Sequence, residues 1–274
     1  MRKLISAFVF TIALSIGVFA QAPKDTVSTR EMNRINWIEF QKMVPATIDT
    51  VLLPTGTLEP HGVANNGADN TAPEAMARDI AFRTNAMIAP TLNYGMTGSL
   101  AAYPGAFKMS EKTYRPFVKE ILEGLVKNKF KNIIILNGHG GGQTAVLQSV
   151  ASQVANEQGV RTLVVNWWSF ASDITREVFG EDGGHAGNNE TAYIQAIDPG
   201  LVDKTKYKDD MATAYPTSGT WSATPFPSSI GLYKEGEGYP KFDQKKAEEY
   251  FKKVNDKIAK LIIEVRKKWD MAKL

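Results

Sequence analysis

Four short apolar runs, rich in β-branched residues, place the strongest constraint on the fold of this chain. They cover residues 48–53, 87–90, 131–136 and 161–167. Their apolar character is largely continuous and does not alternate, which is typical of strands covered on both faces in a parallel sheet. The runs therefore predict a mainly parallel central sheet between helix layers.

Helical patterns alternate with these runs, near residues 73–83, 112–129, 143–157 and 243–268. This order predicts an α/β protein, a three-layer α/β/α sandwich. The last helix has an apolar stripe from Ala247 to Trp269 at spacings of three and four, which fits core packing or a subunit contact. Residues 204–242 have Pro, Gly, Ser and Trp without periodicity, so we expect long loops there.

The N-terminus has the pattern of a secretory signal peptide. Met1, Arg2 and Lys3 precede an apolar run that ends with the small-residue pair Val18 and Ala20. We expect cleavage after residue 20, a single domain over 21–274, and a periplasmic or secreted protein without stable membrane association. The alternative is an uncleaved anchor, because the run is about as long as a short spanning helix.

Charge and cysteine content exclude several classes of function. The chain has 32 Lys and Arg against 29 Asp and Glu, and residues 1–20 contain two of the positive charges. A nearly neutral mature chain without a basic block predicts no nucleic-acid partner. The absence of cysteine excludes disulfides, thiolate metal ligands and a cysteine nucleophile.

The three histidines lie in glycine-rich or turn-like segments beside expected strand ends. His61 lies in TGTLEPHG between Glu59 and Asp69, His139 in NGHGGGQT, and His185 in GGHAGNNET. An open α/β sheet collects its ligand-binding groups at strand ends. Imidazole and carboxylate together suit Zn, Mn or Fe ions, and such sets without cysteine are typical of hydrolytic zinc sites.

Two competing interpretations of the glycine-rich segments are weaker. NGHGGGQT at a helix start could hold a phosphate, but it has neither the Lys-Ser/Thr pair of a P-loop nor the third glycine of the dinucleotide fingerprint. A serine hydrolase is not favoured either, because no G-x-S-x-G segment occurs.

The segments TGTLEPHG, NGHGGG and HAGNNET resemble, in order and spacing, those of the creatininase (creatinine amidohydrolase) family. Further similarity covers INWIEF, NYGMTGSLAAYPG and IGLYKEGEGYP, at residues 35–40, 93–105 and 230–240. The resemblance implies a metal-dependent amidohydrolase with an α/β/α fold, commonly oligomeric, that binds two divalent ions around a bridging aspartate. A hydroxide between the ions would attack a small cyclic or linear amide.

Carried over to this sequence, the resemblance implies a role for each polar residue of these segments. Asp69 would be the bridging ligand, and His185 would face the substrate as the acid/base for the leaving nitrogen. Glu190 would be a further carboxylate ligand or lie just behind the ligands. The remaining implied ligands are Glu59, His61 and His139.

The sequence also departs from the family pattern. A metal-binding glutamate of creatininase proper corresponds to Gly141, and the usual GHGGN ends in Gly142. The loop VANNGA at 63–68 is one residue shorter than usual, and LAAYPG lacks the usual histidine. These departures favour a substrate other than creatinine. They also keep open a rival interpretation, a periplasmic small-molecule-binding protein that retains the fold without turnover.

Aromatic residues supply candidates for a substrate pocket. Trp167 and Trp168 end the fourth apolar run and could form the wall of a flat pocket, although core or interface positions are equally compatible with the sequence. Trp221 and Tyr233 lie in the loop-rich region and are further pocket candidates.

Overall fold

The computed structural model describes residues 29–214, 220–233 and 240–274. The expected signal peptide and part of the segment 230–240 lie outside these ranges. Within them, no helix combines the length and apolar character needed to cross a membrane.

The described residues form a four-stranded parallel sheet with the strand order β2-β1-β3-β4. The strands are β1 (Thr50–Thr55), β2 (Met87–Ile88), β3 (Asn132–Asn137) and β4 (Arg161–Asn166). All four expected runs contribute a strand, although the second contributes only two residues. A separate parallel pair joins β5 (Thr213–Ala214) and β6 (Leu232–Tyr233).

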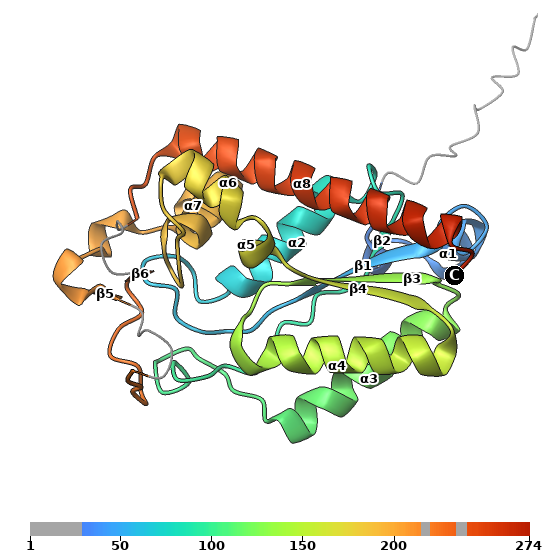
Figure 1. Cartoon of the computed structure of the whole chain (residues 1–274), viewed down its shortest axis with the longest axis horizontal. Helices are drawn as coiled ribbons and strands as arrows, with labels where there is room; N and C mark the ends of the chain where they lie inside the picture. Colours follow the sequence, from blue (N-terminus) through green and yellow to red (C-terminus); the bar gives the residue numbers. More distant parts are fainter. Residues whose placement is uncertain (1–28, 215–219, 234–239) are drawn as a thin grey trace, which may run out of the picture.

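Helices cover both faces of the sheet and confirm the predicted three-layer α/β/α architecture. In Figure 1, α3 (Glu111–Lys127) and α4 (Gly141–Gln158) lie below the sheet. The opposite layer contains α2 (Ala68–Ile80), α5 (Trp167–Phe170), α6 (Ser172–Phe179), α7 (Asn188–Ile197) and α8 (Gln244–Met271). The shorter elements are α1 (Trp37–Met43) and four 3-10 helices at Met32–Arg34, Pro199–Leu201, Lys204–Lys206 and Asp209–Met211.

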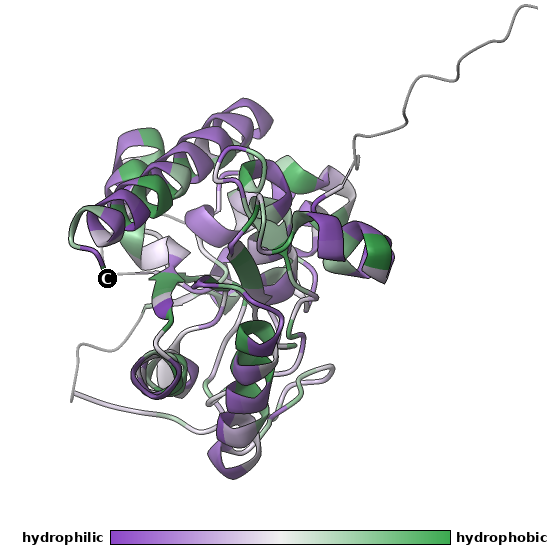
Figure 2. Cartoon of the chain, turned by 90° about the vertical axis from the view of Figure 1, so that its right-hand side faces the viewer, coloured by the Kyte–Doolittle hydropathy of each residue, from purple (hydrophilic) through white to green (hydrophobic). Residues whose placement is uncertain are grey.

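Alternate side chains of each strand enter two separate cores. Leu52 and Ile134 pack with α2 and α8, whereas Val51 and Ile133 pack with α3 and α4. Successive residues of a strand point to opposite faces, so burial of both faces explains why the runs are continuously apolar. Figure 2 shows the corresponding hydropathy, with apolar colour at the central sheet and hydrophilic colour along the outer sides of the helices.

The structure differs from the sequence prediction mainly at helix starts. Helix α2 begins at Ala68, before the expected residue 73, so Asp69 lies in the first helical turn and not in a loop. Pro73 lies inside the helix, where its missing N–H leaves the carbonyl of Asp69 without the usual helical donor. Helices α6 and α7 were not predicted, because their apolar patterns are short.

Candidate metal centre

Strand register brings the predicted ligands to one edge of the sheet. Thr55 at the end of β1 pairs with Asn137 at the end of β3, so the segments after both strands leave the sheet at the same level. The first of these segments carries Glu59 and His61, and the second carries His139. The sheet thus places these three side chains together, as the sequence predicts.

Two glycines allow the start of α2 to approach both strand ends. A Cβ atom on Gly138 would lie 1.9 Å from the backbone oxygen of Asp69, and one on Gly56 would lie 2.3 Å from it. Neither position has room for a side chain. The first turn of α2 therefore rests against β1 and β3, and the positive end of the helix favours the carboxylate of Asp69 there.

Asp69 lies at the centre of the cluster, between two histidines. Its Oδ1 is 2.9 Å from His61 Nε2, and its Oδ2 is 2.8 Å from His139 Nδ1. On the outer sides, Glu59 Oε1 is 3.3 Å from His139 Nδ1, and Glu190 Oε2 is 3.6 Å from His61 Nε2. The arrangement forms two sets that share Asp69.

We call Glu59, Asp69 and His139 the first half-site, and His61, Asp69 and Glu190 the second half-site. In each half-site, one possible ligand atom from each residue lies within 4.8 Å of the others. A carboxylate shared in this way can bridge two cations. The geometry therefore accommodates the pair of ions that the sequence resemblance implies.

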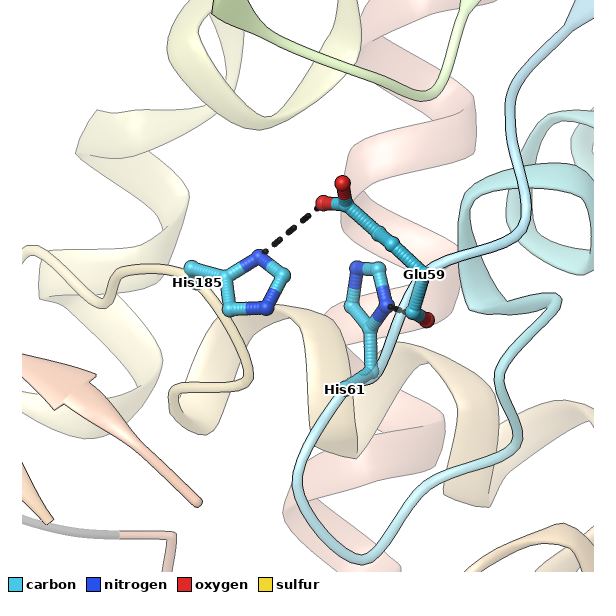
Figure 3. Close-up of side chains that lie close together, drawn as sticks. All are labelled: Glu59, His61 and His185. Carbon is cyan, nitrogen blue, oxygen red and sulfur yellow. Dashed lines mark hydrogen bonds and ion pairs between the residues drawn. The ribbon is translucent and has the colours of Figure 1, made fainter. Parts of the chain in front are cut away.

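His185 lies against the same cluster. Its Nδ1 is 3.6 Å from Glu59 Oε1 and 4.0 Å from Glu190 Oε2. Figure 3 shows its ring beside that of His61, and the ring centroids are 4.3 Å apart. Glu59, His61 and His185 form a third group that meets the same distance condition. His185 is thus within reach of both half-sites.

Backbone carbonyls fix the tautomer of every histidine in the cluster. Because a carbonyl only accepts hydrogen bonds, the ring nitrogen facing it carries the proton, and the other nitrogen of a neutral ring has a free lone pair. The three bonds are His61 Nδ1 to Glu59 O at 3.0 Å, His139 Nε2 to Met96 O at 3.3 Å, and His185 Nε2 to Pro60 O at 2.7 Å. Metal-binding histidines are usually oriented in this way.

The remaining atoms are suited to cations. His61 Nε2 and Asp69 Oδ2 are buried without a hydrogen-bond partner. The lone pairs of His61 and His139 face carboxylate oxygens at less than about 3 Å, a contact that is repulsive unless a cation or a proton lies between the atoms. Nitrogen and carboxylate donors in this arrangement fit Zn, Mn or Fe ions.

The pKa values show how the cluster behaves without metal. Burial lowers the pKa of His61, but the carboxylates of Asp69, Glu190 and Glu59 outweigh it and raise this pKa to about 10. Burial raises the pKa of Glu190 to about 7. Burial and the charge of His61 lower the pKa of His185 to about 4. Burial lowers the pKa of His139 as well, but the carboxylates of Asp69 and Glu59 raise it above its ordinary value. Protons therefore compete with metal in both half-sites, and His185 is neutral at neutral pH.

A cavity of about 460 Å³ adjoins the cluster. Glu59, Asp69, His139, His185 and Glu190 line its polar side. Its apolar wall consists of Met96, Leu100, Trp168, Phe226 and Leu232. The Tyr103 hydroxyl donates to the carbonyl of Phe226 at 2.6 Å and ties together two of the loops that form this wall. The cavity has the size and character of a small-molecule site.

The structure separates the four predicted pocket aromatics. Trp168 lines the cavity, but its neighbour Trp167 is buried in the core, with its ring centroid 4.7 Å from that of Tyr193. Trp221 is 43% exposed and stacks on Phe226 without lining the cavity. Tyr233 does not line it either, because the preceding residue of β6, Leu232, faces the cavity and successive strand residues alternate.

The sequence analysis missed the other apolar wall residues, since Met96, Leu100 and Phe226 lie in loops without a periodic signal.

The structure also clarifies the position of Gly141. A Cβ atom there would meet no other atom within 4 Å. Glu190 instead supplies the carboxylate opposite His61, from the first turn of α7.

Comparison with known proteins shows which family the chain belongs to. A family model described as creatininase, creatinine amidohydrolase, matches residues 33–262. Creatinine amidohydrolase from Pseudomonas putida is 24% identical over 226 residues, which cover 74% of this chain and 86% of that protein. The mycofactocin precursor peptide peptidase of Mycobacterium ulcerans (strain Agy99) is 24% identical over 171 residues, 58% of this chain and 62% of that one.

The fold comparison agrees. A crystal structure of creatinine amidohydrolase (creatininase) superposes with a TM-score of 0.75 at 22% identity, covering 86% of this chain and 97% of that one. The family match extends over β1 and β3, which precede three of the candidate ligands, and over α2 and α7, which carry Asp69 and Glu190. The chain therefore belongs to the creatininase family of amidohydrolases.

Proposed function

We propose that this protein is an exported metal-dependent amidohydrolase that cleaves a C–N bond of a small cyclic or linear amide. The observation that carries the proposal is the pair of half-sites sharing Asp69 beside a small-molecule cavity. The names of the two relatives, an amidohydrolase and a peptide peptidase, support the reaction type.

Two divalent ions fit the donors, one in each half-site. Solved creatininases include one described as Zn-Zn type and one described as Mn, which supports zinc or manganese as candidates, and iron is chemically compatible. When bound, such ions polarise a substrate carbonyl and make water a stronger nucleophile. The carboxylates of Glu59, Asp69 and Glu190 offset three of the four added positive charges.

His185 is the residue best placed to move protons. Pro60 holds its Nε2–H, so the Nδ1 lone pair faces the ligand cluster and the cavity. A neutral imidazole can accept the proton of the attacking water and deliver it to the amide nitrogen, which leaves only when protonated. The low pKa of His185 keeps Nδ1 unprotonated before the reaction and makes the protonated ring a strong acid, which suits delivery of the proton to the amide nitrogen.

The apolar part of the cavity lining bears on the class of substrate. The wall of Leu100, Trp168 and Phe226 would contact an apolar or flat substrate body. Together with the departures at Gly141 and LAAYPG, this wall supports an amide other than creatinine.

Export and oligomerisation belong to the same proposal. The signal-like residues 1–20 support a periplasmic or secreted enzyme, and intact-mass measurement of periplasmic material should give a chain beginning at residue 21. A full-length chain in the membrane fraction would contradict export.

A groove whose exposed aromatic side chains include Tyr94, Phe107 and Phe117 supports a homo-oligomer. Light scattering tests this oligomeric state.

Elemental analysis followed by an amide panel tests the enzymatic proposal. Two ions per chain, with amide hydrolysis that is lost on chelation and restored by metal, would support it. A chain that holds one ion or none and hydrolyses no amide would instead indicate the rival function, a binding protein without turnover.

A further inference from the structure

Gln143, in the first turn of α4, is fully buried and does not line the substrate cavity. Its side-chain amide nevertheless bonds in three directions. Oε1 accepts the N–H of Met96 at 3.0 Å, and Nε2 donates to Asn137 Oδ1 at 3.2 Å and to the carbonyl of Gly56 at 3.4 Å. One amide therefore links the loop at Met96 to the ends of β1 and β3.

Two of these partners hold the metal-ligand candidate His139. The carbonyl of Met96 accepts its Nε2–H at 3.3 Å. The Asn137 side chain brackets its backbone, since Nδ2 donates to the His139 carbonyl at 2.6 Å and Oδ1 accepts the His139 N–H at 3.2 Å. Gln143 therefore completes a closed path of hydrogen bonds. The path runs from the His139 imidazole to Met96, then to Gln143 and Asn137, and back to the His139 backbone.

The surrounding backbone makes room for this amide. A Cβ atom on Gly95 would lie 2.0 Å from Gln143 Oε1 and 2.5 Å from the carbonyl oxygen of Gly56. A side chain at position 95 would thus displace either the amide or the end of β1. The close approach of Gly95 gives Gln143 one defined place beside Met96.

We propose that Gln143 is a positioning residue for His139. By holding the Met96 peptide, it keeps the carbonyl where it accepts the Nε2–H of His139, so that the ring directs Nδ1 at Asp69 and Glu59. The inference rests on the proposed metal-dependent function. It requires that loss of the Gln143 amide weakens the ion of the first half-site and spares that of the second.

The test compares Gln143→Met with Gln195→Met. Methionine has a similar length and cannot form the three hydrogen bonds. Gln195 is a matched control, because it is also buried but bonds to Gln244 and the carbonyl of Phe242, away from the half-sites. Zn²⁺ affinities are measured by competition with a chromophoric chelator. The hydrogen bond of the His139 Nε2–H is followed by ¹H–¹⁵N NMR of the ring in the metal-free protein.

For Gln143→Met, one of the two dissociation constants should rise by roughly 10- to 100-fold, the usual effect of losing a group that orients a ligand. The weakened ion should be the one that Glu59→Gln also weakens, and the Nε2–H signal of His139 should shift or broaden. Gln195→Met should change neither. Gln143→Glu keeps the acceptor for the Met96 N–H, so the Nε2–H signal of His139 should change less and the Zn²⁺ affinity should fall less.

Several results would overturn the proposal. Unchanged Zn²⁺ dissociation constants and an unchanged Nε2–H signal of His139 in Gln143→Met would exclude positioning. If the affinity for both ions falls equally and the thermal stability falls with it, Gln143 is an ordinary core residue. If wild-type protein binds no metal, the proposed function fails. The NMR spectra of Gln143→Glu and Gln143→Met then still decide whether the Gln143 amide fixes the orientation of the His139 ring.

Discussion

The two half-sites share Asp69 but are built from different kinds of structure. The first half-site takes Glu59 and His139 from segments that follow two adjacent paired strands. The second takes Glu190 from α7, which follows a loop with left-handed residues at Gly183 and Ala186. The first is therefore fixed by sheet register, whereas the second depends on how one loop places a helix.

The difference extends to solvent. The Glu59 side chain is 4% exposed and that of Glu190 is 13% exposed. Protons compete with metal in both half-sites, because the pKa values of His139 in the first and of His61 and Glu190 in the second are raised. We expect the first half-site to hold its ion tightly and the second to exchange its ion more readily.

The largest expected effect comes from the residue that the halves share. Asp69→Ala should abolish stoichiometric binding at both half-sites, because it removes a ligand from each and leaves two cations without the charge between them. Plasma emission analysis of purified protein measures the loss. Asp79→Ala, on the exposed side of the same helix, is the control and should keep both ions. Two ions retained in Asp69→Ala would exclude a bridging role.

A second large effect is expected at His185, which faces both halves. If it only transfers protons, His185→Ala should keep near-normal metal content while kcat falls by roughly 10² to 10⁴. The loss should be smaller for an activated amide, whose nitrogen leaves with less proton transfer. Metal content and kcat on both amides check this. Loss of an ion would make His185 a ligand, and unchanged kcat would remove it from catalysis.

Single-carboxylate variants separate the halves. Glu190→Gln should release the more weakly held ion and leave the other, whereas Glu59→Gln should weaken the tighter one. Both keep the size of the side chain, so only the charge and metal affinity change. Chelator competition gives both constants for each variant. If Glu190→Gln affects the tighter ion, our ranking of the half-sites is wrong.

The metal-free protein should lose stability as the pH rises from 7 to 10. The folded-state pKa of His61, about 10, lies above its ordinary value of 6.5, so its protonation stabilises the fold fully below 6.5 and ceases to do so as the pH rises through 10. Thermal melts in chelator follow this loss. His61→Gln should flatten the decline, and a stability that rises with pH in this window would contradict the assignment.

The smallest expected effect concerns the cavity wall. Trp168→Phe should raise KM by roughly 2- to 10-fold, since an aromatic contact contributes about 0.5–1.5 kcal/mol. Trp221→Phe should leave KM unchanged, because Trp221 lies outside the cavity lining. Kinetics on any amide that the panel identifies compares the two. Equal effects would mean that the substrate extends beyond this cavity.

The sequence was sufficient to predict the parts that depend on short-range pattern. The continuous apolar runs predict the sheet. Because the carboxyl ends of its parallel strands lie at one edge, Glu59, His61 and His139 could be grouped from the sequence alone. Asp69 was assigned through the family resemblance, but its position in a helix was not predicted. Proline usually marks the start of a helix, whereas Pro73 lies within α2.

Features that depend on long-range packing could not be predicted. Trp167 and Trp168 are adjacent in sequence, but a helical turn points them in different directions, one into the core and one into the cavity. The amide of Gln143 has no sequence signal, because its partners Met96 and Gly56 are distant along the chain. Loop packing decides both cases.

Anomalous diffraction from crystals grown with Mn²⁺ or Zn²⁺ tests the central claim most directly. Our account predicts two peaks per chain, one among Glu59, Asp69 and His139 and one among His61, Asp69 and Glu190, with Asp69 touching both. A single peak, or two peaks that do not share Asp69, would contradict the account.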